Sequence, residues 1–361
     1  MDPMLKLQDV GELWLIDNII APMARRYDTQ TETGNDCAYI PVSECHLAVT
    51  ADVGPKPVLH SLKGYENDLK ARGWLAVVVN ASDIATAGAR PLFLTNCVDA
   101  PPDLPVNDLE ELLTGYFEAC AEFEFRNGGG DLRQGTELAM RVFAVGTCSK
   151  SYMVGRDKAT ASDLLYIVGP AGQFIANYLI AKSIIENNAK LSQEVENIVR
   201  FPRPQLRAME ILVSRGLVVT ASDTSDGLLG AISNIARRSC CDFHLTLCEG
   251  MLTPEIKQAA NLNSIDPWNI FFAWGDWSVA TVIRSEDKFT FEQVCRENSI
   301  VYQQLGIVTG RKEEQEKITA TIGDGLSRDL TILRNENFTA KGFNAKLSDH
   351  LDHLLKTPLF R

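Results

Sequence analysis

Six aspartates of the chain stand beside small residues, at points where predicted strands end or helices begin. They are Asp36, Asp52, Asp83, Asp131, Asp223 and Asp226. If these carboxylates converge in space, they cannot all stay ionised without cations, because like charges in one site repel strongly. Hard oxygen ligands select Mg²⁺ or Ca²⁺ over soft metals, and Mg²⁺ also accepts phosphate oxygens. The pattern therefore predicts a magnesium site that a triphosphate would complete.

A run of three glycines, Gly128 to Gly130, precedes Asp131. Such a run permits a close backbone approach, and its amides could point at phosphate. The free N–H groups at the start of the helix predicted from Leu228 offer the same chemistry. Taken singly, however, each aspartate is also typical of a helix cap or a turn, so a local role stays open for each. The chain lacks a Gly-x-x-x-x-Gly-Lys-Ser/Thr loop and the His-Arg-Asp set of protein kinases.

The elements that must position these residues mix strands with helices. Apolar patterns predict strands over 47–53, 92–98 and 140–148, helices over 74–89 and 107–125, and a glycine loop over 127–131. Further along, they predict strands over 164–168 and 217–221, and helices over 176–188, 205–214 and 228–238. This alternation indicates an α+β or mixed α/β protein of about two domains, with a boundary near residue 151.

Five segments in this order resemble the thiamine-monophosphate kinases. These enzymes belong to the aminoimidazole-ribotide-synthetase-like superfamily, together with selenophosphate synthetases and a hydrogenase maturation factor. The resemblance spans about residues 30 to 230 and includes Arg156 in the stretch between the domains. The segments are Gly34-Asn35-Asp36-Cys37-Ala38, Thr50-Ala51-Asp52, Val79-Asn80-Ala81-Ser82-Asp83 with Gly88-Ala89-Arg90-Pro91, Gly129-Gly130-Asp131, and Ser222-Asp223-Thr224-Ser225-Asp226-Gly227.

The resemblance implies an enzyme that binds ATP and several Mg²⁺ ions between two domains. Residues 1–151 would form an N-terminal α/β domain whose sheet builds a barrel with a second subunit, and residues 152–361 a C-terminal α/β sandwich. The implied metal ligands are Asp36, Thr50, Asp52, Asp83, Asp131, Asp223 and Asp226, of which Asp36 and Asp226 are the implied catalytic residues. The implied nucleotide contacts are Gly130, Asp131, Arg156 and Ser225. His60, Asp276 and Trp277 fall near acceptor-binding positions, although a packing role is open for both His60 and Trp277.

The acceptor half departs from the family pattern. Asn35 replaces an aspartate, Ala51 replaces a hydroxyl residue, and Trp274-Gly275-Asp276-Trp277-Ser278 stands where the family has Gly-Glu-Asp-Tyr-Glu. We therefore expect a phosphotransferase whose small-molecule acceptor is not thiamine monophosphate. Two alternatives remain. One is an ATP-dependent synthetase or cyclo-ligase that activates a carbonyl or amide oxygen; the other is a nucleotide-binding dimer without catalysis.

Composition limits the remaining function classes. The chain has 361 residues and a formal net charge of −12, which disfavours a nucleic-acid partner because phosphate binding needs clustered Lys and Arg. No apolar run is long enough to span a membrane, and the start lacks the pattern of a signal peptide. The nine cysteines, irregularly spaced, suggest reduced thiols in a cytoplasmic protein. A homodimer is expected from the resemblance, and His350 and His353 are expected on a solvated helix face, with metal binding as the alternative.

Overall fold

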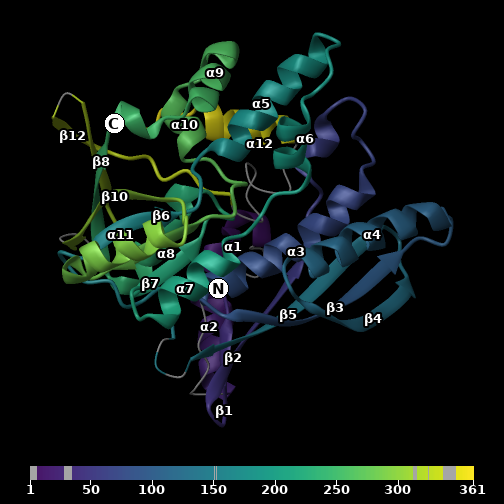
Figure 1. Ribbon diagram of the computed structural model, residues 1–361, viewed down its shortest axis with the longest axis horizontal. Helices are drawn as coiled ribbons and strands as arrows, with labels where there is room; N and C mark the ends of the chain where they lie inside the picture. Colours follow the sequence, from purple (N-terminus) through teal and green to yellow (C-terminus); the bar gives the residue numbers. More distant parts are fainter. Residues whose placement is uncertain are drawn as a thin grey trace.

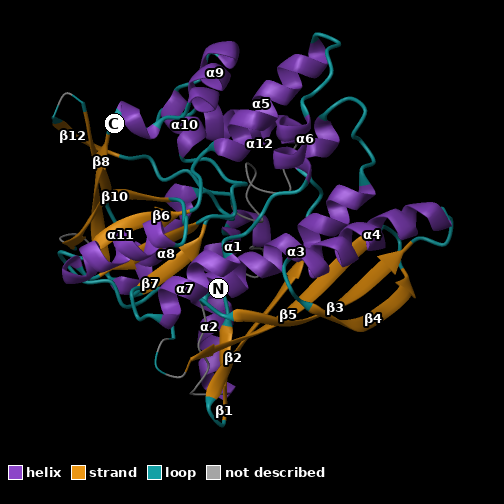
Figure 2. Ribbon diagram, in the orientation of Figure 1, coloured by secondary structure: helices purple, strands orange, loops and turns teal. Residues whose placement is uncertain are grey.

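The computed structural model describes residues 6–27, 35–149, 151, 153–311, 315–323, 325–335 and 347–361. Two β-sheets form its framework, and helices pack on both of them (Figures 1 and 2). The α+β class predicted from the sequence is confirmed. The predicted boundary near residue 151 lies between the last strand of the first sheet and the first strand of the second.

The first sheet has five strands in the order β1-β2-β5-β3-β4. All neighbours are antiparallel except β3 and β4, which are parallel and joined by a helical crossover. Along β5, buried side chains alternate with more exposed ones. One face of the sheet is therefore packed against the rest of the protein, and the other face is left uncovered. The strands are β1 (Ala38–Val42), β2 (Cys45–Val53), β3 (Arg90–Ala100), β4 (Arg126–Gln134) and β5 (Ala139–Ser149).

Helices α3 (Leu69–Thr86) and α4 (Val106–Glu122) cover the packed face of this sheet (Figure 2). Asp68 caps α3, because its carboxylate accepts a hydrogen bond from the Ala71 amide. The two helices touch backbone to backbone: a Cβ added at Gly73 would lie 1.9 Å from the Leu112 carbonyl oxygen. The sequence places glycine where this close crossing requires it.

The second sheet has seven strands in the order β12-β11-β8-β10-β6-β9-β7. Helices α5, α8, α9 and α10 share one hydrophobic core with one face, whereas α7 and α11 pack on the other face. The strands are β6 (Leu164–Val168), β7 (Thr220–Asp223), β8 (Cys241–Leu247), β9 (Val279–Ile283), β10 (Tyr302–Gly310), β11 (Ile318–Ile322) and β12 (Leu326–Asp329). The helices are α5 (Gln173–Glu186), α6 (Gln193–Arg200), α7 (Leu206–Ser214), α8 (Leu228–Ser239), α9 (Pro254–Asn263), α10 (Pro267–Phe271) and α11 (Lys288–Glu297).

The hydrophobic core on the α7 and α11 face of this sheet continues into the first half of the chain. It joins α7 to α3, and Val213 of α7 lies where a Cβ at Gly88 would fall, 2.3 Å away. Helix α3 is therefore packed against elements of both halves, and residues on its C-terminal turns face the second sheet. This packing fixes the position of Asp83 relative to the end of β7.

Both ends of the described chain contact the second half. The N-terminal helices are α1 (Gly11–Leu15) and α2 (Ala21–Tyr27), linked through a wider turn at Ile16–Ile20, where Asp17 pairs with Arg237 of α8. Near the C-terminus, α12 (Leu347–Lys356) is tied to α10, because Asn269 donates hydrogen bonds to the carbonyls of Leu354 and Thr357.

Two local expectations from the sequence are wrong. Residues 127–131 belong to strand β4 rather than to a loop, since pairing with β3 satisfies the backbone of a segment whose composition alone indicates a turn. His350 is buried and stacks on Trp274 with ring centroids 5.9 Å apart, in place of the expected solvated position. The stacked indole ring covers the imidazole from solvent.

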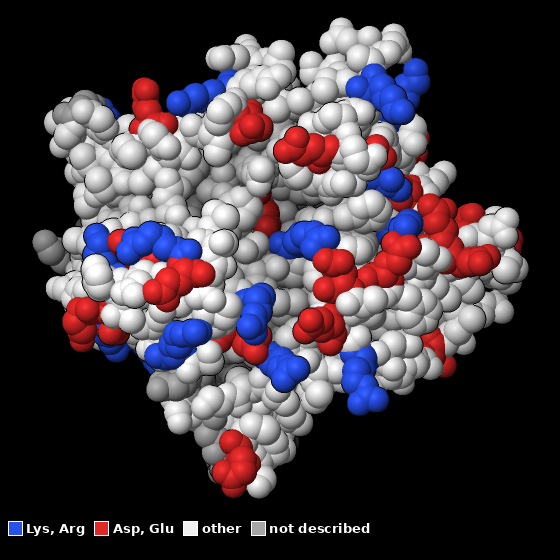
Figure 3. All heavy atoms as spheres, viewed as in Figure 1, with Lys and Arg blue, Asp and Glu red and all other residues white. Residues whose placement is uncertain are grey.

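On the face shown in Figure 3, groups of Lys and Arg are interspersed with Asp and Glu and do not form one continuous basic patch. None of the helices in the described part of the chain has the length and apolar character needed to cross a bilayer. All nine cysteines are free thiols.

Candidate nucleotide and metal site

A cavity of about 1390 Å³ lies between elements of the two halves. Its wall contains five of the six predicted aspartates, together with Thr50, Arg156 and Ser225. The five are Asp36, Asp52, Asp83, Asp223 and Asp226. Segments far apart in the chain therefore deliver carboxylates to one space, as the sequence predicts.

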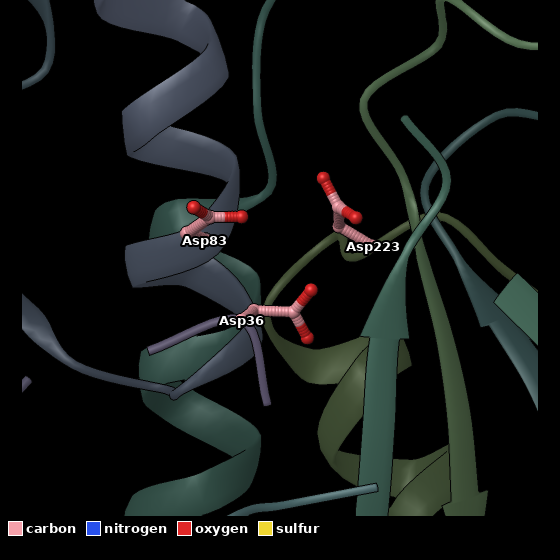
Figure 4. A group of neighbouring side chains, drawn as sticks. All are labelled: Asp36, Asp83 and Asp223. Carbon is pink, nitrogen blue, oxygen red and sulfur yellow. The ribbon is translucent and has the colours of Figure 1, made fainter. Parts of the chain in front are cut away.

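Three of these carboxylates form a compact group, which we call the aspartate trio: Asp36, Asp83 and Asp223. One ligand oxygen of each lies within 4.8 Å of the others. Figure 4 shows the three side chains directed towards a common space. Asp83 comes from α3, Asp223 ends β7, and Asp36 lies just before β1. The trio offers only hard oxygen donors, which fit Mg²⁺ rather than a soft metal.

Hydroxyl side chains hold two members of the trio, Asp83 and Asp223, in place. Thr50 Oγ1 donates to Asp83 Oδ2 at 2.5 Å. Ser82 Oγ and Ser225 Oγ donate to the two oxygens of Asp223, each at 2.9 Å. Each of these bonds leaves lone pairs of the acceptor carboxylate available, because an ionised carboxylate accepts about four hydrogen bonds or metal contacts. The neighbours thus orient the carboxylates without using them up.

Burial and mutual repulsion disfavour the ionised form of these groups. Burial raises the pKa of Asp36 to about 7, against the opposing effect of Arg156 and with added repulsion from Asp223 and Asp226. The pKa of Asp83 lies well above its ordinary range because of burial first, and then because of Asp52, Asp223 and Asp36. A bound divalent cation would reverse this by compensating the charge, so the residues present fit an Mg²⁺ site.

Asp52 and Asp226 flank the trio. Burial raises the pKa of Asp52, whose backbone amide donates to Asn80 Oδ1 at 3.2 Å. Burial also raises the pKa of Asp226 to about 6, although the nearby guanidinium of Arg334 lowers it. Asn80 is not among the site residues expected from the sequence, and its only signal is a polar side chain within an apolar helix.

Two arginines bring positive charge to this acidic space. Arg156 pairs with Asp36, and its backbone amide donates to Asn35 Oδ1 at 3.1 Å. Arg334 Nη2 lies 3.2 Å from Asp226 Oδ2. Sequence reasoning identifies Arg156 but misses Arg334, because a lone arginine in a coil near the C-terminus carries no pattern.

Gly130 and Asp131 lie outside the cavity wall, so the expectation that all six aspartates of one chain converge is wrong for Asp131. The reason is the register of the first sheet. Asp131 pairs with Cys97, which pairs with Arg141 on the uncovered face. Asp52 instead pairs with Val142, one residue along β5, and therefore points to the opposite face.

The predicted acceptor residues separate in the structure. His60 and Trp277 line the cavity, and His60 Nε2 lies 3.0 Å from the carbonyl oxygen of Asp68. Asp276 does not line it. Its carboxylate accepts hydrogen bonds from the amides of Gly172 and Phe174, at 2.6 and 2.7 Å, and so caps the start of α5. Burial raises the pKa of Asp276 to about 6 despite these bonds.

Comparison with known proteins shows which family the chain resembles. The family model of the AIR synthase related protein N-terminal domain matches residues 34–148, and that of the C-terminal domain matches residues 160–319. Thiamine-monophosphate kinase of Aquifex aeolicus is 28% identical over 253 residues, which are 70% of this chain and 79% of that protein. The enzyme of the same name from Prochlorococcus marinus is 26% identical over 284 residues, 75% of this chain and 79% of that protein.

Solved structures show the same fold. "AaThiL complexed with AMPPCP and TMP" aligns with a TM-score of 0.72 and 20% identity, covering 92% of this chain and 99% of that one. "Crystal structure of HypE-HypF complex" aligns with a TM-score of 0.66 and 19% identity, covering 87% and 99%. The resemblance inferred from the ordered motifs is thereby confirmed. With both family models matched over most of its length, the chain belongs to the family of AIR synthase related proteins.

Proposed function

We propose that this protein is a Mg²⁺-dependent phosphotransferase that uses ATP and acts on a small-molecule acceptor. The observation that carries the proposal is the aspartate trio. One of its carboxylates is buried and two are half-buried, their oxygens lie within 4.8 Å of one another, and they stand in the wall of a cavity large enough for a nucleotide and a second molecule. The sequence relatives named as kinases and the neighbour named as a complex with AMPPCP support the reaction class.

The trio, with Thr50, Asp52 and Asp226 beside it, would hold the metal ions. Bound Mg²⁺ would neutralise charge on the phosphates of ATP. Arg156 would add a fixed positive charge at the side of Asp36, and Ser225, which also lines the cavity, would contact the nucleotide. Positioning and electrostatics of this kind supply most of the rate in phosphoryl transfer.

The chemical step would be a direct transfer. An acceptor oxygen forms a bond to the γ-phosphorus, while the bond from that phosphorus to the bridging oxygen breaks and ADP leaves with the electron pair. The acceptor's proton passes to a carboxylate of the cavity. Asp226, which lines the cavity beside the trio, would accept this proton.

The acceptor is proposed to differ from thiamine monophosphate. His60, Trp274 and Trp277 line the cavity, and the Trp274 ring contacts those of Phe174 and His350 with centroid distances of 6.0 and 5.9 Å. Asp276 is committed to the cap of α5 and is not available to bind an acceptor. An aromatic wall of this composition favours a flat or partly apolar molecule.

A homodimer is proposed as the working form. Large apolar side chains on the uncovered face of the first sheet are exposed: Ile40, Val53, Phe93 and Phe143. An apolar sheet face of this kind is typical of an interface. Asp131 shares this face with Arg141, so we propose that Gly130 and Asp131 reach a nucleotide only across the interface, in the partner's cavity.

Product analysis tests the function. The protein is incubated with Mg²⁺, ATP and pools of small metabolites, and ³¹P NMR follows the fate of the γ-phosphate. The proposal expects a new phosphomonoester or phosphoanhydride resonance that is absent with an Asp223→Asn variant. Free phosphate with a cyclised or dehydrated product would instead favour an ATP-dependent synthetase, and nucleotide binding without turnover would favour a non-catalytic dimer.

A further inference from the structure

Arg334 brings a second guanidinium to the cavity from a part of the chain far from Arg156. Its Nη2 donates to Asp226 Oδ2 at 3.2 Å and to Asn234 Oδ1 at 2.7 Å. The side chain is 11% exposed and forms part of the cavity wall. Arg156 and Arg334 therefore both line the cavity, one paired with Asp36 and the other with Asp226.

The backbone fixes the place of Arg334 independently of its ion pair. The amide of Asn335 donates to the carbonyl oxygen of Asp226 at 3.1 Å. The amide of Thr331 donates to the carbonyl oxygen of Leu359 at 2.7 Å. Helix α8 leaves room for this segment at Gly230, where an added Cβ would lie 3.2 Å from Arg334 Cβ. A side chain at position 230 would press against the segment that carries Arg334.

The guanidinium retains unused donors. Arginine has five N–H donors in a planar fork. The contacts made within the described part of the chain use only those on Nη2, and Nε is buried with no hydrogen-bond partner among the described residues. A buried donor without a partner costs free energy, whereas the fork matches phosphate oxygens in pairs.

We propose that Arg334 binds the polyphosphate of the nucleotide, as a second guanidinium beside that of Arg156. This inference rests on the proposed function, because it requires a nucleotide in this cavity. The ion pair with Asp226 holds the guanidinium in position before the nucleotide binds. When a divalent cation binds the oxygens of Asp226, the positive charge of Arg334 is freed for phosphate.

Titration calorimetry with MgAMPPCP and with AMP tests this. Arg334→Gln is expected to bind MgAMPPCP at least tenfold more weakly than the wild type and AMP within twofold of it, and Arg334→Lys is expected to fall between the two. Arg207→Gln, which removes an exposed arginine of α7, is the matched control and should bind as the wild type does. Thermal unfolding without ligand checks that each variant folds.

A second variant separates phosphate binding from simple neutralisation of Asp226. If Arg334 only neutralises that carboxylate, Asp226→Asn/Arg334→Gln will bind MgAMPPCP as Asp226→Asn does, and the inference is overturned. If Arg334 binds phosphate, the double variant will lose at least a further fivefold. Equal binding by the wild type and Arg334→Gln would overturn this inference alone, whereas absence of binding by the wild type would overturn the proposed function as well.

Discussion

Asp83 is the carboxylate on which the chemistry of the cavity depends most. It is half-buried, accepts a hydrogen bond from Thr50 and lies within reach of two other carboxylates. Without a cation, the ionised form of Asp83 is disfavoured. With a cation bound, the three neighbouring carboxylates can ligate it together. The free energy that the trio costs the ligand-free protein is thus recovered on metal binding.

Replacing Asp83 with Asn should abolish most of the stabilisation by MgAMPPCP while leaving the ligand-free protein at least as stable as the wild type. The change removes one ligand and one source of repulsion. Wild type at ligand concentrations of about 100 Kd should gain about 2.7 kcal/mol. Thermal unfolding with and without ligand measures this, and Asp103→Asn on an exposed turn is the control. A full ligand response by Asp83→Asn would contradict the role given to it.

The stability of the metal-free protein should fall as pH rises from about 4 to about 7. Asp36 and Asp226 have folded pKa values of about 7 and about 6, above the ordinary value of 3.8, so the folded state binds more protons in this window. The stabilisation that they contribute is fully present below about pH 4 and is lost as the pH rises through these pKa values. Urea unfolding in EDTA between pH 4 and 8 measures it, and Mg²⁺ should flatten the decline. The assignment would be contradicted if stability rose with pH in protein that retains both aspartates but did not rise in Asp36→Asn/Asp226→Asn.

The sequence could predict which aspartates are candidates but not how all of them are used. Asp36, Asp83 and Asp223 follow small residues at element ends, and that signal is local. The exclusion of Asp131 depends on strand register, because a shift of one residue along β5 sends a side chain to the other face. Arg334 depends on a tertiary contact with α8 that no local pattern encodes.

At the scale of elements, α3 links the site to the core. It carries Asp83 in its C-terminal half and packs against α4 through its own Gly73 and through Gly115 of α4. Its long apolar stretch was predictable from composition, and its start at Asp68 follows from the cap. Strand β4 was not predictable, since Arg126–Gln134 is fully exposed and glycine-rich, and only pairing with β3 makes it a strand.

Gly73→Ala should destabilise the protein by about 2–3 kcal/mol, because the new Cβ would lie 1.9 Å from the Leu112 carbonyl oxygen and the two helices would have to separate. Chemical unfolding followed by circular dichroism measures the change. Gly310→Ala is the matched control, since nothing lies within 4 Å of its added Cβ, and it should change stability by less than about 0.5 kcal/mol. If Gly73→Ala left the stability unchanged, the close contact described between α3 and α4 would be contradicted.

At the scale of the whole molecule, the site exists only because the two halves pack together. The trio takes Asp36 and Asp83 from the first half and Asp223 from the second, and one hydrophobic core runs through both. Sequence reasoning could place a boundary near residue 151, yet it could not show that α3 and α7 share this core. The uncovered face of the first sheet is an apolar surface that a second copy would bury.

A dimer through this face should dissociate in Phe143→Asp, since a charge would be placed at the centre of an apolar interface. Light scattering coupled to size exclusion should give twice the monomer mass of 39.9 kDa for the wild type and the monomer mass for the variant. Leu262→Asp, at an exposed position of α9, is the control and should remain dimeric. A monomeric wild type at micromolar concentration would remove the dimer from the proposal.

The central claim is that the aspartate trio holds the metal that binds the nucleotide. Crystals grown with Mn²⁺ and AMPPCP test it most directly, because Mn²⁺ takes the same oxygen ligands as Mg²⁺ and gives an anomalous signal. We predict an anomalous peak bonded to oxygens of Asp36, Asp83 and Asp223 and to a phosphate oxygen. A bound nucleotide whose metal lies elsewhere, with the three carboxylates unliganded, would contradict the account.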